Sequence, residues 1–318
     1  MTRDFFYCSE LSRASDERAY GTASVGGVWL LLEYTREWKP RAFEDSALPP
    51  EVKNRLHSIL RGIPHSRLLF VKQQRRAENG QSFFVVRARE QGAFVVRFAL
   101  ESYEELSRIN VAAVARGRAL EGGTRTFEPL FLVCTHGRRD KCCAKFGFPL
   151  YKSLRERAGE QVWQSSHVGG DRFAANLVCF PDGLFYAHVT EDAGRRILEE
   201  HAAHRLYLDK YRERSCYSYP VQAAEFFVRR ESGLRGLDEL RNLSYERLGE
   251  RSWRVRFVAP GEGRVHEALI GCRQSEFQNY VTCEAAEPRA VTQFYLDEYR
   301  SETDPAAARP PAPPLNDC

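Results

Sequence analysis

Three of the nine cysteines in this chain fall within ten residues, in the segment Cys134-Thr-His-Gly-Arg-Arg-Asp-Lys-Cys142-Cys143. A second segment, Ser166-His167-Val-Gly-Gly-Asp171, places a histidine and an aspartate on either side of two glycines. Thiolates and imidazoles are the ligands that zinc and iron–sulfur clusters take from proteins, and glycines let a backbone approach such a group closely. The two segments therefore predict a metal or iron–sulfur site.

A [2Fe–2S] cluster needs four protein ligands in two pairs, because the bridging sulfides fill the other two positions on each iron. Cys134 and Cys143 can form one pair, and His167 with Asp171 can form the other. Two alternatives concern the fourth ligand: Cys142 can replace Asp171, and Asp171 can instead cap a helix that begins at Arg172.

Two other site chemistries use the same residues. Tetrahedral zinc takes sulfur, nitrogen and carboxylate ligands and suits the set Cys134, Cys143, His167 and Asp171. The second chemistry is that of a redox-sensing thiol, Cys134 or Cys143. Arg138, Arg139 and Lys141 of the first segment would activate it, because nearby positive charge lowers the pKa of a thiol.

The remaining cysteines lie far apart in the sequence, and we expect them to be ordinary thiols. Cys179 sits in an apolar run and is predicted to be a core residue. The scattered cysteines are Cys8, Cys216, Cys272, Cys283 and Cys318. His136, between Cys134 and Gly137, is predicted to form hydrogen bonds within its loop and not to bind a metal.

The elements around the two segments follow a recurring order. A strand at 130–133 leads into the cysteine segment, a helix covers 149–157, and a strand at 161–164 enters the His167 segment. Strands at 177–180 and 184–189 and an amphipathic helix over 191–211 follow. Residues 28–98 show the same strand, helix, strand and hairpin order without the thiols, with Thr35 to Pro40 in place of the cysteine segment. This order is typical of a thioredoxin-like domain.

We therefore predict an α/β protein with duplicated thioredoxin-like domains, central mixed sheets and a small carboxy-terminal α+β module. The predicted divisions are 1–125 for the half without ligands, 126–217 for the half with them, and 218–303 for the module. The segment 304–318 is rich in proline and alanine and is predicted to be a disordered tail.

The segment from about Leu130 to Val189 resembles the sucrase/ferredoxin-like family, a branch of the thioredoxin-like ferredoxins. The resemblance rests on the cysteine segment, on Ser166 to Asn176, on Pro181-Asp-Gly183 and on the opening motifs Gly21-Thr-Ala23 and Trp29-Leu-Leu-Leu-Glu33. It implies a [2Fe–2S] cluster held by two cysteines and by two histidines in a His-x-x-x-His pattern. Carried over by position, the cysteines are Cys134 and Cys143 and the first histidine is His167.

This chain departs from the family pattern at the fourth position, where Asp171 stands in place of the second histidine. The missing ligand can come from Asp171, Cys142 or Cys179, or the branch has lost its cluster and kept the fold. The resemblance implies electron transfer to an unidentified redox partner protein.

Composition excludes several other classes. The formal net charge of +4 arises from 47 basic and 43 acidic residues that are interleaved along the chain, so we expect no binding of nucleic acid. No apolar run approaches the ~18 residues of a membrane helix, so we expect no membrane association. The first residues lack the apolar core of a signal peptide and the cysteines are odd in number, so we expect a cytoplasmic protein with free thiols.

Overall fold

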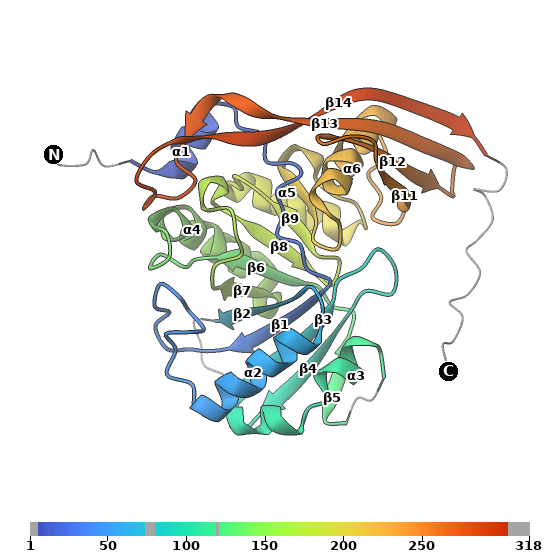
Figure 1. Cartoon of the computed structure of the whole chain (residues 1–318). Helices are drawn as coiled ribbons and strands as arrows, with labels where there is room; N and C mark the ends of the chain where they lie inside the picture. Colours follow the sequence, from blue (N-terminus) through green and yellow to red (C-terminus); the bar gives the residue numbers. More distant parts are fainter. Residues whose placement is uncertain (1–5, 74–79, 119–120, 305–318) are drawn as a thin grey trace.

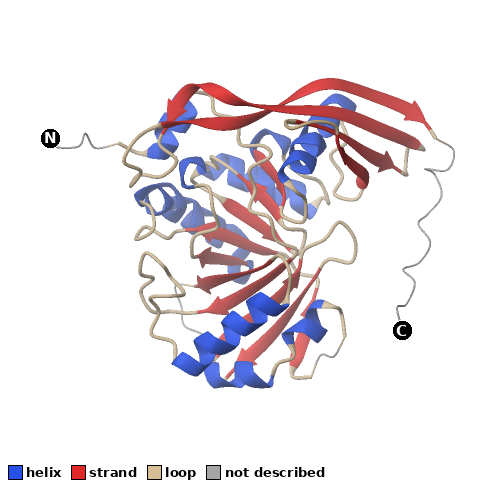
Figure 2. Ribbon diagram, viewed as in Figure 1, coloured by secondary structure: helices blue, strands red, loops and turns tan. Residues whose placement is uncertain are grey.

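The computed structural model describes residues 6–73, 80–118 and 121–304. It contains a ten-stranded mixed sheet with helices and a separate four-stranded antiparallel sheet near the carboxyl terminus (Figures 1 and 2). The prediction of an α/β fold with a carboxy-terminal α+β module is confirmed. We expected a separate central sheet in each half, but the two halves share one sheet because they pair edge to edge.

The first half follows a short helix, α1 (Cys8–Ala14), and contributes five strands to the large sheet. Its elements are β1 (Val28–Glu33), α2 (Pro50–Gly62), β2 (Ser66–Lys72), β3 (Gln81–Arg87), β4 (Phe94–Leu100), the 3-10 helix η1 (Tyr103–Arg108), α3 (Val111–Ala115) and β5 (Gly123–Thr126).

The second half repeats this arrangement with five more strands. Its elements are β6 (Leu130–Cys134), α4 (Lys141–Ala158), η2 (Gly159–Gln161), β7 (Val162–Ser165), η3 (Asp171–Phe173), β8 (Leu177–Phe180), β9 (Leu184–Tyr186), α5 (Glu191–Ala202), η4 (Leu208–Lys210) and β10 (Tyr211–Arg214).

The strand order shows the internal repeat directly. The sheet reads β10-β9-β8-β6-β7-β2-β1-β3-β4-β5, so each half has its first strand beside its parallel second strand and its antiparallel third strand. The halves meet where β2 pairs antiparallel with β7, through Val71 opposite Ser165 and Lys72 opposite Gln164. The predicted division at 125/126 falls inside β5, one residue before that strand ends at Thr126.

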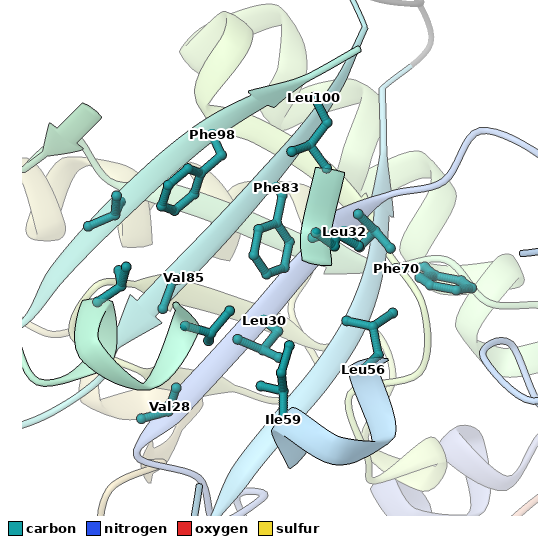
Figure 3. Close-up of a cluster of buried hydrophobic side chains, with 14 of the residues drawn as sticks. Val28, Leu30, Leu32, Leu56, Ile59, Phe70, Phe83, Val85, Phe98 and Leu100 are labelled. Carbon is teal, nitrogen blue, oxygen red and sulfur yellow. The ribbon is translucent and has the colours of Figure 1, made fainter. Parts of the chain in front are cut away.

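The core of the first half explains why these residues form these elements. Every second residue of β1, namely Val28, Leu30 and Leu32, lies on the face of the strand that packs against α2 (Figure 3). The helix contributes Leu56 and Ile59 to the same core. The other face of β1 presents side chains to a second core that reaches into the site-bearing half. Because both faces are covered, all six residues of β1 are buried.

Two predicted helix boundaries in the second half are wrong. Helix α4 begins at Lys141, eight residues before the predicted start at Pro149, because the Asp140 side chain accepts a hydrogen bond from the Cys142 N–H and caps the helix. Helix α5 ends at Ala202 and does not reach 211, since the chain turns at His204, whose φ is 54°.

The carboxy-terminal module consists of one helix packed on an antiparallel sheet. Its elements are α6 (Tyr219–Ser232), β11 (Arg241–Arg247), β12 (Ser252–Ala259), β13 (Arg264–Asn279) and β14 (Arg289–Thr303). The long strands β13 and β14 extend beyond α6 and reach α1, which lies near the start of the sequence (Figure 1). Of the predicted tail, only Asp304 belongs to the described residues.

Among the described residues, no helix combines the length and the apolar character needed to cross a bilayer.

Candidate metal centre

The two predicted segments meet at one edge of the large sheet. Strands β6 and β7 are parallel, with Cys134 opposite Ser165, so the loops that follow them leave the sheet at the same end. Cys134 is the last residue of β6 and Cys143 lies in the first turn of α4. His167 follows β7, and Asp171 opens η3.

Three of these side chains form one group, and the fourth, Asp171, contacts two of them. The ligand atoms of Cys134, Cys143 and His167 all lie within 4.8 Å of one another. Asp171 contacts two of the three: its Oδ1 is 3.0 Å from His167 Nδ1 and 3.7 Å from Cys143 Sγ. Cys143 Sγ is 3.9 Å from His167 Nδ1.

A close approach of α4 to β6 brings the two cysteines together. A Cβ atom added to Gly147 would lie 2.0 Å from the Cys134 carbonyl oxygen, far inside van der Waals contact. Glycine at this position therefore allows the helix backbone to pass directly over the end of β6. The Asp140 cap fixes the start of the same helix, which sets the direction of the Cys143 side chain.

A buried arginine holds the His167–Asp171 loop. Gly169 and Gly170 have φ values of 93° and 80°, which favour glycine. The Arg212 guanidinium lies under this turn and donates to Gly169 O at 3.1 Å and to Asn176 Oδ1 at 2.6 Å. A Cβ on Gly170 would lie 2.6 Å from the same guanidinium, so the turn and the arginine fit only with glycine.

The structure does not support a capping role for Asp171. The residue before η3 is Gly170, and no side chain caps that 3-10 helix. Arg172 pairs with Glu17, so the Asp171 carboxylate is left facing His167 and Cys143.

Hydrogen bonding among the buried groups shifts their protonation. The pKa of Cys134 is lowered well below its usual value because the thiol of Cys143 and the ring of His167 both stabilise its thiolate. The same contact raises the pKa of Cys143. Burial alone would lower the pKa of His167, but its contact with the Cys134 thiolate and the Asp171 charge raise it. Burial raises the pKa of Asp171.

The first half covers the site from one side. His136 Nε2 lies 2.9 Å from the Lys39 carbonyl oxygen, its Nδ1 accepts from the His167 N–H at 3.3 Å, and its ring packs edge-on against Trp38. These bonds agree with the loop role predicted for His136. Cys134, Cys143 and Asp171 are at most 4% exposed, whereas the His167 side chain is 21% exposed and borders a hollow of about 260 Å³.

Cys142 does not join this group. Its Sγ points away from Cys143 into a second cluster with Cys8, Cys283 and Asp140. Cys179 is buried in β8 within the core, as predicted. Cys8 and Cys283 were expected to be ordinary thiols. No local motif marks them, because they lie 275 residues apart and meet only through the fold.

The chemistry of the donors fits a metal centre. Two sulfurs, an imidazole nitrogen and a carboxylate from two loops provide the four ligands that a tetrahedral zinc or a [2Fe–2S] cluster requires. Within the described part of the chain, all eight cysteines are free thiols, so none of these sulfurs is consumed in a disulfide. The buried Cys, His and Asp side chains are able to hold a metal ion.

Comparison with known proteins identifies a family for this chain. No curated protein and no solved structure matches the chain significantly. The model of the sucrase/ferredoxin-like family matches residues 19–213, more than half of the chain, and this range includes Cys134, Cys143, His167 and Asp171. The chain therefore belongs to the sucrase/ferredoxin-like family.

Proposed function

We propose that this protein transfers electrons through a [2Fe–2S] cluster bound by Cys134, Cys143, His167 and Asp171. The observation that carries the proposal is the grouping of Cys134 and Cys143, from the β6–α4 segment, with His167 from the loop after β7. Asp171 of the same loop adds a fourth donor, because its carboxylate contacts His167 and Cys143. When bound, such a cluster supplies reversible one-electron transfer.

The protein's own residues hold and shield the site in this proposal. Cys134 and Cys143 anchor it from the core side, where neither sulfur meets water. His167 is the donor closest to solvent and gives the shortest path to a partner. Trp38 and His136 close the side toward the first half and exclude water, which strengthens local electrostatic interactions.

Asp171 is the proposed fourth ligand in the place of the family's second histidine. Its Oδ1 contacts both His167 and Cys143, whereas Cys142 points elsewhere and Cys179 is enclosed in β8. Of the three alternatives for the missing ligand, the geometry favours the carboxylate.

Mononuclear zinc is the second candidate. The ligand atoms of Cys134, Cys143 and His167 lie within 4.8 Å of one another, a spacing that suits donors sharing a single ion. If neither metal binds, the lowered pKa of Cys134 supports a thiol redox role on the same fold.

We further propose a cytoplasmic location and a protein redox partner. Free thiols at all eight described cysteines suit a reducing compartment. The partner would approach the hollow beside His167, whose lining includes Arg41 and Arg139.

The test is anaerobic purification followed by an absorption spectrum, iron and acid-labile sulfide assays, and electron paramagnetic resonance after reduction. The proposal expects visible charge-transfer bands, about two irons and two sulfides per chain, and a paramagnetic signal on reduction. Cys134→Ser, Cys143→Ser and His167→Ala should each lose the spectrum. A colourless protein with about one zinc at this site would establish the second candidate.

Two variants complete the experiment. Asp171→His restores the family's usual ligand, so it should keep the iron, whereas Asp171→Ala should lose it or hold it weakly. Cys272→Ser is the matched control, because Cys272 lies in β13 outside both cysteine groups and should leave the spectrum unchanged.

A further inference from the structure

A second group of sulfurs lies next to the first but faces a different part of the molecule. The Sγ atoms of Cys8, Cys142 and Cys283 form a triangle with edges of 3.6, 3.2 and 3.5 Å. The two carboxylate oxygens of Asp140 lie 3.9 and 3.8 Å from Cys8 Sγ. All four side chains belong to residues that are at most 4% exposed.

These separations are close to those in the ligand shell of one tetrahedral ion, with the sulfur–sulfur edges somewhat shorter. With metal–sulfur bonds of about 2.3 Å, two sulfurs on one zinc are ~3.8 Å apart, and a sulfur and a carboxylate oxygen are ~3.6 Å apart. A disulfide would need one pair at about 2.0 Å and would leave the third sulfur unused. Sulfurs bound to different irons of a cluster would be further apart than this triangle allows.

Backbone N–H groups point at two of these sulfurs and at the carboxylate. The Ser9 N–H points at Cys142 Sγ at 3.5 Å, and the Cys8 N–H points at Cys283 Sγ at 3.4 Å. Asp140 accepts from the N–H groups of Cys142 and Cys283 at 2.8 and 2.6 Å, which orients its carboxylate. Two of its four lone-pair sites remain for a metal.

An apolar shell encloses the group. Aromatic side chains of Phe6, Tyr7, Phe146 and Tyr280 pack around the cysteines. Lys141 lies over the rings of Phe6 and Tyr7, so a cation stands outside the shell. A dry, enclosed group of four donors with no open position is the arrangement of a structural zinc site and not of a catalytic one.

The donors come from three segments that are distant in sequence. Cys8 belongs to α1, Asp140 and Cys142 to the start of α4, and Cys283 to the turn between β13 and β14, which reaches α1 and α4 in Figure 1. Cys8 and Cys283 lie outside the residues that the family model matches, whereas Asp140 and Cys142 lie inside them, so the site joins the matched region to segments beyond it.

We propose that Cys8, Cys142, Cys283 and Asp140 bind a structural zinc ion that fastens α1 and the β13–β14 turn to α4. The donor set favours zinc, because a tetrahedron of three soft thiolates and one harder carboxylate suits Zn²⁺. The carboxylate oxygen disfavours copper(I). This site is independent of the proposed electron-transfer centre.

The test measures zinc and iron separately in the purified full-length protein. Wild type should carry about one zinc in this site, and Cys8→Ser and Cys283→Ser should each lose that zinc while keeping the iron and the visible spectrum. Cys143→Ser should do the reverse, losing iron and keeping zinc. Cys272→Ser, in the same module as Cys283, should lose neither.

A second measurement covers variants that fold poorly. Zinc-depleted, reduced wild type titrated with cobalt(II) should develop thiolate-to-cobalt charge-transfer absorption, and Cys283→Ser should not. Zinc removal should also speed amide exchange in α1 and in residues 280–288. Wild type that holds no more zinc or cobalt than Cys283→Ser would overturn the proposal, and so would a disulfide between two of these cysteines in the freshly isolated protein.

Discussion

Neighbouring side chains at the start of α4 serve two different groups. Residues that follow one another in a helix point about 100° apart, so Cys142 and Cys143 diverge from a shared backbone. Cys143 turns toward Cys134 and His167, and Cys142 turns toward Cys8 and Cys283. Substitutions at these two positions should therefore have separable effects on metal content.

His167→Cys should lower the reduction potential of the loaded protein. Exchange of a neutral imidazole for a thiolate adds negative charge at the cluster, and we expect a shift of roughly 100–300 mV to lower potential. Spectroelectrochemical titration measures the shift. His57→Gln, on the exposed face of α2, is the control. An unchanged potential in His167→Cys would show that His167 is not a ligand.

His188 should make the protein less stable in mild acid. Burial lowers its pKa to about 3, and its ring lies 3.4 Å from Ser9 Oγ and 3.5 Å from Ser12 Oγ. Between about pH 6.5 and pH 3 the unfolded chain binds a proton that the folded chain does not, so the free energy of unfolding falls as the pH falls. The expected contribution is about 2 kcal/mol between neutral pH and pH 5.

Urea denaturation at both pH values measures this loss. His188→Asn should reduce the pH dependence, because asparagine does not titrate and tolerates the φ of 49° at this position. The same pH dependence in His188→Asn and wild type would contradict the assignment to His188.

The sequence was sufficient to find one group of residues and not the other. Cys134, Cys143, His167 and Asp171 stand out because each pair lies within ten residues, on segments rich in glycine and charge. Cys8 and Cys283 carry no such signal, since their proximity depends on where β13 ends relative to α1. Local spacing predicts sites built on one or two loops and does not reveal sites built from distant segments.

At the scale of elements, close packing between α4 and β6 controls the geometry of the centre. At Gly147 the backbone of α4 lies directly against the Cys134 carbonyl group, with no room for a side chain between them. The loop after β7 depends in a similar way on the Arg212 side chain beneath it. Each contact offers a way to disturb the site without touching a ligand.

Gly147→Ala should displace α4 and weaken the centre. The new methyl group cannot fit against the Cys134 carbonyl, so we expect a loss of about 1–3 kcal/mol in the free energy of unfolding and a reduced iron content. Gly62→Ala at the end of α2 is the matched control, because no atom lies within 4 Å of the added Cβ there. Thermal denaturation and iron assay report both; equal behaviour of the two variants would contradict the packing argument.

Arg212→Lys should loosen the His167 loop. Lysine keeps the charge but loses the planar fork that reaches Gly169 O, Asn176 Oδ1 and Thr22 O. The unsatisfied buried acceptors should cost about 2–4 kcal/mol of stability in urea denaturation. Arg195→Lys, on the surface of α5, should change stability by at most about 0.5 kcal/mol. A neutral Arg212→Lys would show that the loop needs no such support.

Sequence patterns predicted most elements but misjudged the start of α4. Proline is common in the first turn of a helix, so Pro149 indicated a start there. The true start depends on the Asp140 cap, which the cysteine motif around it obscured. The end of α5 was missed because the apolar spacing continues past Ala202, although those residues belong to a loop and to η4.

At the scale of the whole molecule, the two halves form one structure. The strand order repeats, yet the halves share a sheet through β2 and β7, and the core around β1 continues into β6. The repeat was predictable from the order of strands and helices. The pairing of β2 with β7 was not, because edge strands give no sequence signal for their partner.

Trp38→Ala should make the centre in the second half lose iron faster in air. Trp38 is 4% exposed, packs on His136 at 5.7 Å and donates to Tyr34 O at 3.1 Å. Its removal opens a cavity beside the site, and we expect bleaching of the visible spectrum to be severalfold faster. Trp253→Ala, in the carboxy-terminal module, is the control. Equal bleaching rates would show that the first half does not shield the site.

The loop at Trp38 has a consequence for how the repeat is used. In the repeat, it occupies the place that the cysteine segment occupies in the other half, and it carries no thiol. The second half thus carries the candidate ligands, while the equivalent loop of the first half covers one side of the site. Because the half with Cys134 and His167 is covered by a loop of the other half, we expect that half expressed alone to expose its site to solvent.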